Sequence, residues 1–109
     1  ANPDAVGVFG YSFLEQNADK LKGANIDAVA PTFDNIAEGK YNISRSLYFY
    51  VKLAHIGTVP GIQEFVEEFT SEASFGEEGY LVDKGLIPLF EGERETIRMQ
   101  ALTLKKLDL

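Results

Sequence analysis

A guanidinium between two hydroxyls is the most suggestive chemistry in the sequence. Ser44, Arg45 and Ser46 stand together directly before a strongly apolar stretch. A guanidinium with hydroxyl donors on either side suits phosphate or carboxylate. The three residues are therefore a candidate anion-binding site. The alternative is a loop in which Arg45 pairs with an acidic side chain.

Ser12 is a second candidate, in the segment Gly10-Tyr11-Ser12 between an apolar run and a helical pattern. A glycine there would leave backbone N–H groups free at a helix N-terminus, an arrangement that binds anions. Ordinary turn chemistry is the alternative, because the phosphate-loop pattern GxxxxGK[ST] is absent. Thr32 begins a later helical pattern, where a plain N-cap is the simpler interpretation.

Catalytic and metal chemistry have little support in the sequence. There is one histidine, His55, and no cysteine, so disulfides, thiolate catalysis and Cys-ligated zinc are excluded. The adjacent pairs Glu67-Glu68 and Glu77-Glu78 cannot converge on one atom if they lie on helices, so we expect them to be solvated. No nucleophile–base or metal-ligand constellation is present, and we expect neither an enzyme nor a bound cofactor.

Alternating strand and helix patterns surround these residues. Short apolar runs predict strands at Ala5–Phe9, at Ile26–Ala30 and at Ser46–Ile56, the last covered on both faces. Apolar residues at helical spacing, with Gly and Pro at the ends of the segments, predict helices over residues 11–22, 32–39, 62–69 and 91–107. They predict a helix or turn over 76–84. Pro88 restricts residues 86–89 to an edge strand or a loop. The alternation predicts an α/β layered fold.

The charge balance narrows the partners. Ten Lys and Arg stand against 17 Asp and Glu, for a net charge of −7. The basic residues form no stripe, so we expect no nucleic-acid or anionic-membrane partner. A small anion stays possible, because local dipoles rather than net charge usually bind it. No apolar stretch approaches the roughly 18 residues of a membrane-spanning helix, so we expect no membrane insertion.

Four segments, in order and in register, resemble the C-terminal part of bacterial periplasmic phosphate-binding proteins, the substrate-binding components of the phosphate ABC transporter. They are GVFGYSFLEQN at 7–17, VAPTFDNIAEGKY at 29–41, SRSLYFYVK at 44–52 and GYLVDKGLIP at 79–88. The resemblance runs from about Ala5 to about Leu89. It implies a two-lobed, hinge-linked fold that closes over inorganic phosphate. It also implies a non-enzymatic, periplasmic protein that delivers phosphate to an ABC permease.

The same resemblance implies a domain organisation. Residues 1–30 correspond to the end of the second lobe, 31–45 to the hinge crossover, and 46–109 to the closing elements of the first lobe. The family's principal phosphate ligands come from its N-terminal half. The chain is therefore expected to pair with that N-terminal remainder or with a copy of itself. The alternative is a free-standing scaffold or interaction domain that no longer binds phosphate.

One departure from the family concerns the crossover. The family pattern tends to read Tyr-Pro-Val-Ser-Arg-Pro-Leu-Tyr, whereas residues 41–48 read Tyr-Asn-Ile-Ser-Arg-Ser-Leu-Tyr. Two prolines are therefore replaced, by Asn42 and Ser46. Proline restricts the unfolded chain, so their loss predicts a looser crossover.

Overall fold

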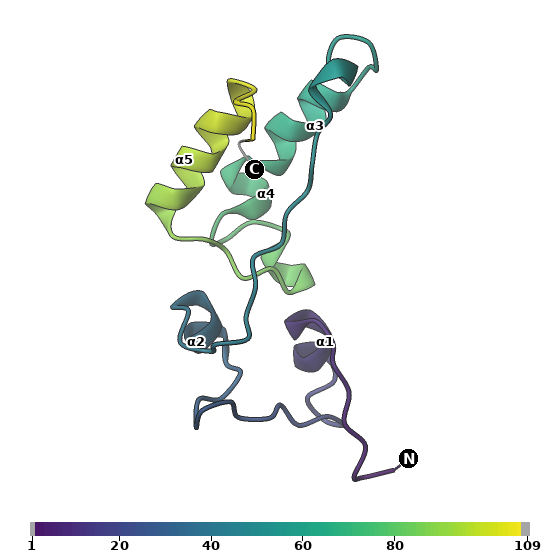
Figure 1. Ribbon diagram of the computed structural model, residues 1–109, viewed down its shortest axis with the longest axis vertical. Coiled ribbons are helices and arrows are strands. Elements are labelled where there is room, and N and C mark those ends of the chain that lie inside the picture. Colours follow the sequence, from purple (N-terminus) through teal and green to yellow (C-terminus); the bar gives the residue numbers. More distant parts are fainter. Residues whose placement is uncertain (1, 108–109) are drawn as a thin grey trace. The chain divides into compact units, whose positions relative to one another are not determined.

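The structure is a computed structural model, and it describes residues 2–107 (Figure 1). The chain divides into two compact units, the first ending at Ile43 and the second beginning at Ser44. The described residues form helices, turns and extended segments without a single strand. The nearest approach to a sheet is one isolated antiparallel bridge between Ile26 and Val29.

The first unit contains two short helices, α1 (Tyr11–Gln16) and α2 (Phe33–Ala37). The Thr32 hydroxyl accepts a hydrogen bond from the Asn35 backbone N–H at 3.3 Å, which confirms the predicted N-cap of α2. Gly39 follows α2 with φ +68°, the left-handed conformation expected of a glycine after a helix.

Helix α1 is shorter than predicted. It begins at Tyr11 as expected but ends at Gln16 rather than near Lys22. The Asn17 side chain donates to the Phe13 carbonyl at 2.8 Å, and the backbone continues as turns over residues 17–20. Asparagine favours such local bonds over helix propagation, which accounts for the early end.

Polar contacts hold the first unit together. Tyr41 Oη donates to the Ala24 carbonyl at 3.0 Å, and Asn42 Nδ2 donates to Asp27 Oδ2 at 2.9 Å. Ile26 and Val29 exchange two backbone hydrogen bonds, at 2.9 and 2.8 Å. None of the described side chains of this unit is fully buried. The unit therefore has a hydrogen-bonded turn framework rather than an apolar core.

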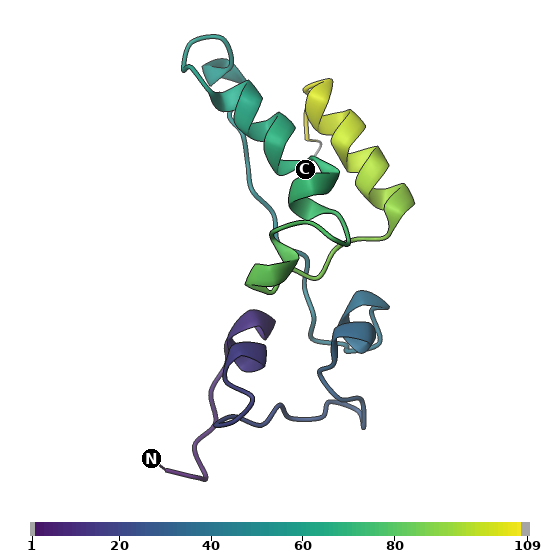
Figure 2. The same ribbon diagram turned by 180° about the vertical axis from the view of Figure 1, so that it is seen from behind.

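The second unit is helical, as Figures 1 and 2 show. Its elements are the 3₁₀ turns η1 (Leu53–His55) and η2 (Val82–Lys84), and the helices α3 (Ile62–Phe69), α4 (Glu72–Phe75) and α5 (Glu91–Leu102). Helix α3 packs against both α4 and α5. The core lies between these helices and contains Val66 and Phe75 together with the buried polar residues Thr70, Ser74 and Arg94.

The amphipathic pattern at 62–69 predicted α3 correctly. Gly61 precedes it with φ +86°, so the turn at Pro60-Gly61 is also as expected. Pro88 lies in a stretch without regular structure, in agreement with its restriction to an edge or a loop. Helix α5 starts at Glu91 as predicted but ends at Leu102, because Leu104 takes a left-handed φ of +55°.

The predicted strands are wrong for the described residues, and the α/β class is not confirmed. Residues 5–9 are irregular, with Val6 and Val8 96% and 98% exposed. The stretch predicted as the strand Ser46–Ile56 is extended up to Lys52 and then turns into η1. It is not covered on both faces, since Leu47 is 89% exposed. A strand exists only through backbone pairing with a neighbour, and these segments have none here.

We expect the small core to make the second unit sensitive to truncation at Phe75. Replacing Phe75, which is 8% exposed, by Ala should lower the free energy of unfolding by roughly 3 kcal/mol, because the cavity left behind cannot fully collapse. The matched control is Phe90→Ala, at a side chain that is 59% exposed and should cost less than about 1 kcal/mol. Urea unfolding measures both, and equal losses would contradict the placement of the core.

Candidate functional site

The segment Ser44-Arg45-Ser46 opens the second unit. Ser44 is half-buried, whereas Arg45 and Ser46 are exposed. No acidic group between residues 2 and 107 lies within ion-pair distance of Arg45. Within that range the alternative in which Arg45 is held by an acid is therefore not observed, and its guanidinium is accessible to an anion.

The backbone geometry divides this candidate site. Figure 1 shows residues 44–52 as one extended trace leading toward α3. In an extended chain successive side chains point to opposite sides. Such an alternation would put Ser44 and Ser46 on one side of the backbone and Arg45 on the other. A single ion held by all three would need the long Arg45 side chain to fold back over the backbone.

Ser12 belongs to the first unit, so the sequence-predicted ligands come from two units. It is the second residue of α1 and is half-buried. Gly10 precedes the helix in an ordinary extended conformation, φ −66° and ψ 153°, so no glycine-specific backbone geometry marks this turn. Burial, with a contribution from the charge of Glu15, raises the pKa of the neighbouring Tyr11.

A cavity of about 480 Å³ lies between the extended segment and the start of α3. Its walls are mainly apolar and aromatic, and Lys52 and His55 contribute the cationic and titratable groups. The lining residues are Phe49, Tyr50, Val51, Lys52, His55, Pro60, Gly61, Ile62 and Phe65. His55 is exposed at the end of η1 and no second histidine or cysteine exists to complete a metal site.

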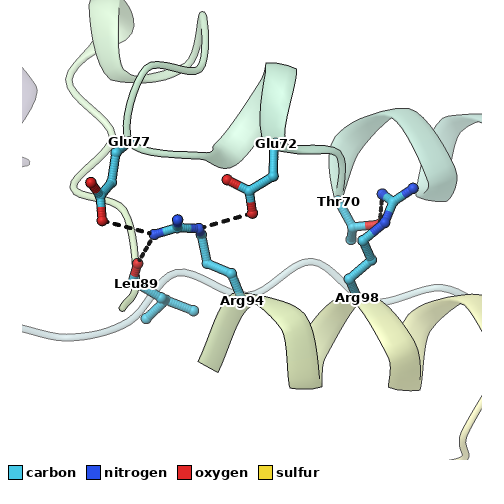
Figure 3. A network of polar contacts seen from close by, with 6 residues as sticks. All are labelled: Thr70, Glu72, Glu77, Leu89, Arg94 and Arg98. Atoms are coloured by element: carbon cyan, nitrogen blue, oxygen red, sulfur yellow. Dashed lines mark hydrogen bonds and ion pairs between the residues drawn. The ribbon is translucent and has the colours of Figure 1, made fainter. Parts of the chain in front are cut away.

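The sequence did not predict the buried polar cluster that surrounds Arg94 (Figure 3). Arg94 lies on α5 and is only 4% exposed. Its Nε donates to Glu72 Oε1 at 3.1 Å, and its Nη1 donates to Glu77 Oε1 at 3.4 Å and to the Leu89 carbonyl at 2.5 Å. The hydrogen bond to Glu72 raises the pKa of Arg94. The cluster ties α5 to α4 and to the loop before α5.

The Arg94 cluster corrects one expectation about the acidic pairs. Glu77 was predicted to be merely solvated, but it pairs with Arg94 while staying largely exposed. Nothing in the sequence marks this partnership, because Arg94 stands among the charged residues of an otherwise ordinary helix. Arg98, one turn further on, donates to the Glu67 carbonyl at 3.0 Å and lies 3.4 Å from Thr70 Oγ1.

The three arginines differ in whether their guanidinium groups are already engaged by contacts within the fold. Arg94 and Arg98 are committed to contacts within the helices of the second unit. Arg45 has no such contact in the described part of the chain. Of the three guanidinium groups, Arg45 is the one that can bind a ligand without breaking the fold. No group of three metal-ligating side chains occurs between residues 2 and 107.

Comparison with known proteins decides the family. The model of the PBP superfamily domain matches residues 1–73, about two thirds of the chain. The chain belongs to the PBP superfamily. No helix in the described range is long and apolar enough to cross a membrane. No solved structure matches the chain significantly.

Curated relatives of this PBP-superfamily chain are phosphate-binding proteins. The phosphate-binding protein PstS of Staphylococcus haemolyticus is 40% identical over 76 residues, which cover 65% of this chain and 24% of the relative. The protein of the same name from Staphylococcus saprophyticus is 37% identical over 71 residues, or 61% of this chain and 22% of the relative. These relatives confirm the family resemblance for the matched part of the chain. The matched part of the chain spans about a quarter of their length.

We expect the Arg94 cluster to stabilise the second unit. Arg94→Met keeps the apolar volume but leaves the Leu89 carbonyl without its donor, so it should lower the free energy of unfolding by about 2 kcal/mol. Arg45→Met is the matched control and should change stability by less than about 0.5 kcal/mol, since Arg45 is exposed. Urea unfolding followed by circular dichroism measures both variants. A neutral Arg94→Met would refute the structural role of the cluster.

Proposed function

We propose that this chain is part of a solute-binding component of high-affinity phosphate uptake, and that it corresponds to the C-terminal portion of such a protein. The complete protein captures inorganic phosphate and delivers it to an ABC permease. The observation that carries the proposal is the 40% identity over 76 residues to a phosphate-binding protein. The relatives are named as binding proteins, which supports a role in capture rather than in catalysis.

The chemistry of the candidate ligands supports this proposal. Phosphate is bound by charge-assisted hydrogen bonds from guanidinium groups and by hydroxyl and backbone donors. The candidate donors of this chain are Arg45, Ser44, Ser46 and Ser12. Arg45 is the strongest candidate among them, since it is charged, exposed and without an ion-pair partner in the range that the structure describes. The net charge of −7 does not oppose this binding, because a few local donors outweigh distant charge at short range.

The proposed domain organisation places residues 1–30 at the end of the second lobe, 31–45 in the crossover, and 46–109 in the closing elements of the first lobe. A boundary between compact units at Ile43 and Ser44 supports a crossover in this part of the chain. In this interpretation Arg45 stands where the crossover enters the first lobe. A ligand held there would be sensitive to how the lobes close.

The scaffold alternative, in which the fold persists without phosphate, gains no support from these relatives. We place the protein on the outer side of the cytoplasmic membrane, in the periplasm where one exists. An uptake permease receives its substrate there.

Phosphate titration of an Arg45 variant tests the proposal. The 109 residues replace the matching stretch of the S. haemolyticus phosphate-binding protein, and isothermal calorimetry measures phosphate affinity. Arg45→Met should weaken binding at least tenfold, because one charge-assisted contact contributes about 1.5–3 kcal/mol. Lys52→Met removes an exposed cation from the same extended segment and should change affinity less than twofold.

Three results would contradict the proposal or the role that it gives to Arg45. A replaced protein that folds but does not bind phosphate would refute the assignment of this chain to phosphate capture. Equal affinity of the parent and Arg45→Met would remove Arg45 from the ligand set. An equal loss of phosphate affinity in Arg45→Met and Lys52→Met would indicate a general effect of charge rather than a contact between Arg45 and phosphate.

A further inference from the structure

The turn at Asp27-Ala28, in the first unit, has an unfavourable backbone conformation. The φ angles of Asp27 and Ala28 are +50° and +63°, both in the left-handed region. In this region the Cβ of an L-residue approaches the following carbonyl oxygen, and Asp tolerates the conformation better than Ala does. Ala28 is therefore strained in a way that a glycine would not be. Such a residue keeps its conformation only where contacts around it offset the cost.

The backbone bonds of the turn are few. Ile26 and Val29 exchange the two hydrogen bonds that close a two-residue hairpin turn, at 2.9 and 2.8 Å. Such a turn needs positive φ at both central residues and favours glycine at the second. Ile26 and Val29 form an isolated bridge, so no ladder continues from it. Because an isolated hairpin is marginally stable even with longer strands, the turn needs further contacts.

Two neighbouring side chains of the crossover make contacts with the turn segment. Tyr41 Oη donates to the Ala24 carbonyl at 3.0 Å, shortly before the turn. Asn42 Nδ2 donates to Asp27 Oδ2 at 2.9 Å, at the first central position of the turn. These contacts join residues 17 and 15 positions apart in the sequence. Two contacts at different points of the turn segment restrict both the position and the direction of the crossover.

We propose that Tyr41 and Asn42 form a clasp that holds the Asp27-Ala28 turn in its left-handed conformation and that the turn, in return, holds the crossover. Opening of the clasp would release the strained turn, and relaxation of the turn would free the crossover, since such coupling is reciprocal. Both hydrogen bonds are exposed to water, so the clasp restrains the crossover reversibly. The proposal concerns conformation and does not depend on phosphate binding.

The Asn42 contact requires a side-chain donor. The family pattern described above has proline at this position, and a proline ring carries no donor. The loss of that proline predicted a looser crossover, whereas the Asn42 amide supplies a restraint of a different kind. Its partner is a carboxylate, and a hydrogen bond to an ionised acceptor is stronger than one between neutral groups. The clasp is therefore specific to the side chains of this chain.

Asn35 connects the same two segments by a second route. Its Nδ2 donates to the Ala30 carbonyl at 2.9 Å, directly after the turn. Its own carbonyl accepts from the Tyr41 N–H at 3.0 Å. The Tyr41 amide therefore reports whether the crossover is held. The amides of Ile26 and Val29, which bond across the turn, report whether the turn is closed.

Amide hydrogen exchange of the 109-residue chain, resolved by NMR, tests the clasp. Asn42→Asp replaces the donor by a second carboxylate beside Asp27. We expect the protection factors of the Ile26 and Val29 amides to fall at least about fivefold, because a charge-assisted hydrogen bond is lost and two like charges meet. Asn25→Asp is the matched control, since it adds the same charge near the turn at an exposed side chain. It should change these protection factors less than about twofold.

A side-chain swap separates the contact from the residues that make it. Asp27→Asn/Asn42→Asp puts the amide in the turn and the carboxylate on the crossover, so that the same bond forms in the opposite direction. Asparagine also tolerates the left-handed conformation. Protection of the Ile26 and Val29 amides should therefore return to within about twofold of the parent chain, because residues in contact have coupled effects.

Ala28→Gly tests the coupling in the other direction, from the turn to the crossover. Glycine adopts a φ of +63° without strain, so the turn should stay closed for longer. The protection factor of the Tyr41 amide should then rise about threefold, although residue 28 lies outside the crossover. Combined with Asn42→Asp, the same substitution should restore most of the protection lost at Ile26 and Val29, because both changes act on one equilibrium.

Five results would overturn the proposal. Ile26 and Val29 amides without protection in the parent chain would show that the turn is not held. Unchanged protection in Asn42→Asp would remove the bond to Asp27 from the clasp. A swapped variant no better protected than Asn42→Asp would attribute the loss to residue 42 alone. Equal losses in Asn42→Asp and Asn25→Asp would indicate a general effect of charge. An unchanged Tyr41 amide in Ala28→Gly would separate the crossover from the turn.

Discussion

A buried guanidinium organises the second unit. Only two apolar side chains, Val66 and Phe75, are buried among the described residues, which is little for helices that pack on one another. Arg94 adds polar contacts between the elements of this unit. Its guanidinium bonds to Glu72 on α4, to Glu77 in the following turn and to the Leu89 carbonyl in the loop before α5. The two carboxylates stay largely exposed, so the cost of taking them out of water is small.

The tight backbone turn after α4 is linked to the Arg94 contacts. Tyr80 and Leu81 N–H groups donate to the Ala73 and Ser74 carbonyls, so the chain folds back tightly after α4. Gly79 allows this return, because a Cβ there would collide with the Ser74 carbonyl. Glu77, which pairs with Arg94, lies within this return. The ion pair and the tight turn therefore support one another.

Local signals in the sequence predicted local structure well. Thr32, Gly39 and Gly61 lie at helix ends as predicted, because capping depends on a few neighbouring residues. The amphipathic spacing of α3 was readable for the same reason. The Arg94 cluster could not be predicted, since its carboxylate partners lie 22 and 17 residues away and Arg94 stands among several other charged residues of α5.

The strands failed for a different physical reason. Leu47–Val51 has the composition of a strand, but strand formation also requires a neighbour, and composition cannot show whether one is present. The candidate site shows the same limit. The sequence identified Ser44, Arg45 and Ser46 as chemically suitable, whereas the extended course of the backbone in this part of the chain became visible only in the structure.

The candidate site and the extended segment are adjacent in the chain, so an interaction that orders one also affects the other. Arg45 stands two residues before Leu47, so any contact that orders the extended segment would fix the backbone direction from which the guanidinium extends. It would also remove water from the neighbouring face, and an ion pair strengthens as the local dielectric falls. An exposed Arg45 on an unpaired segment can meet an anion but holds it against full solvent competition.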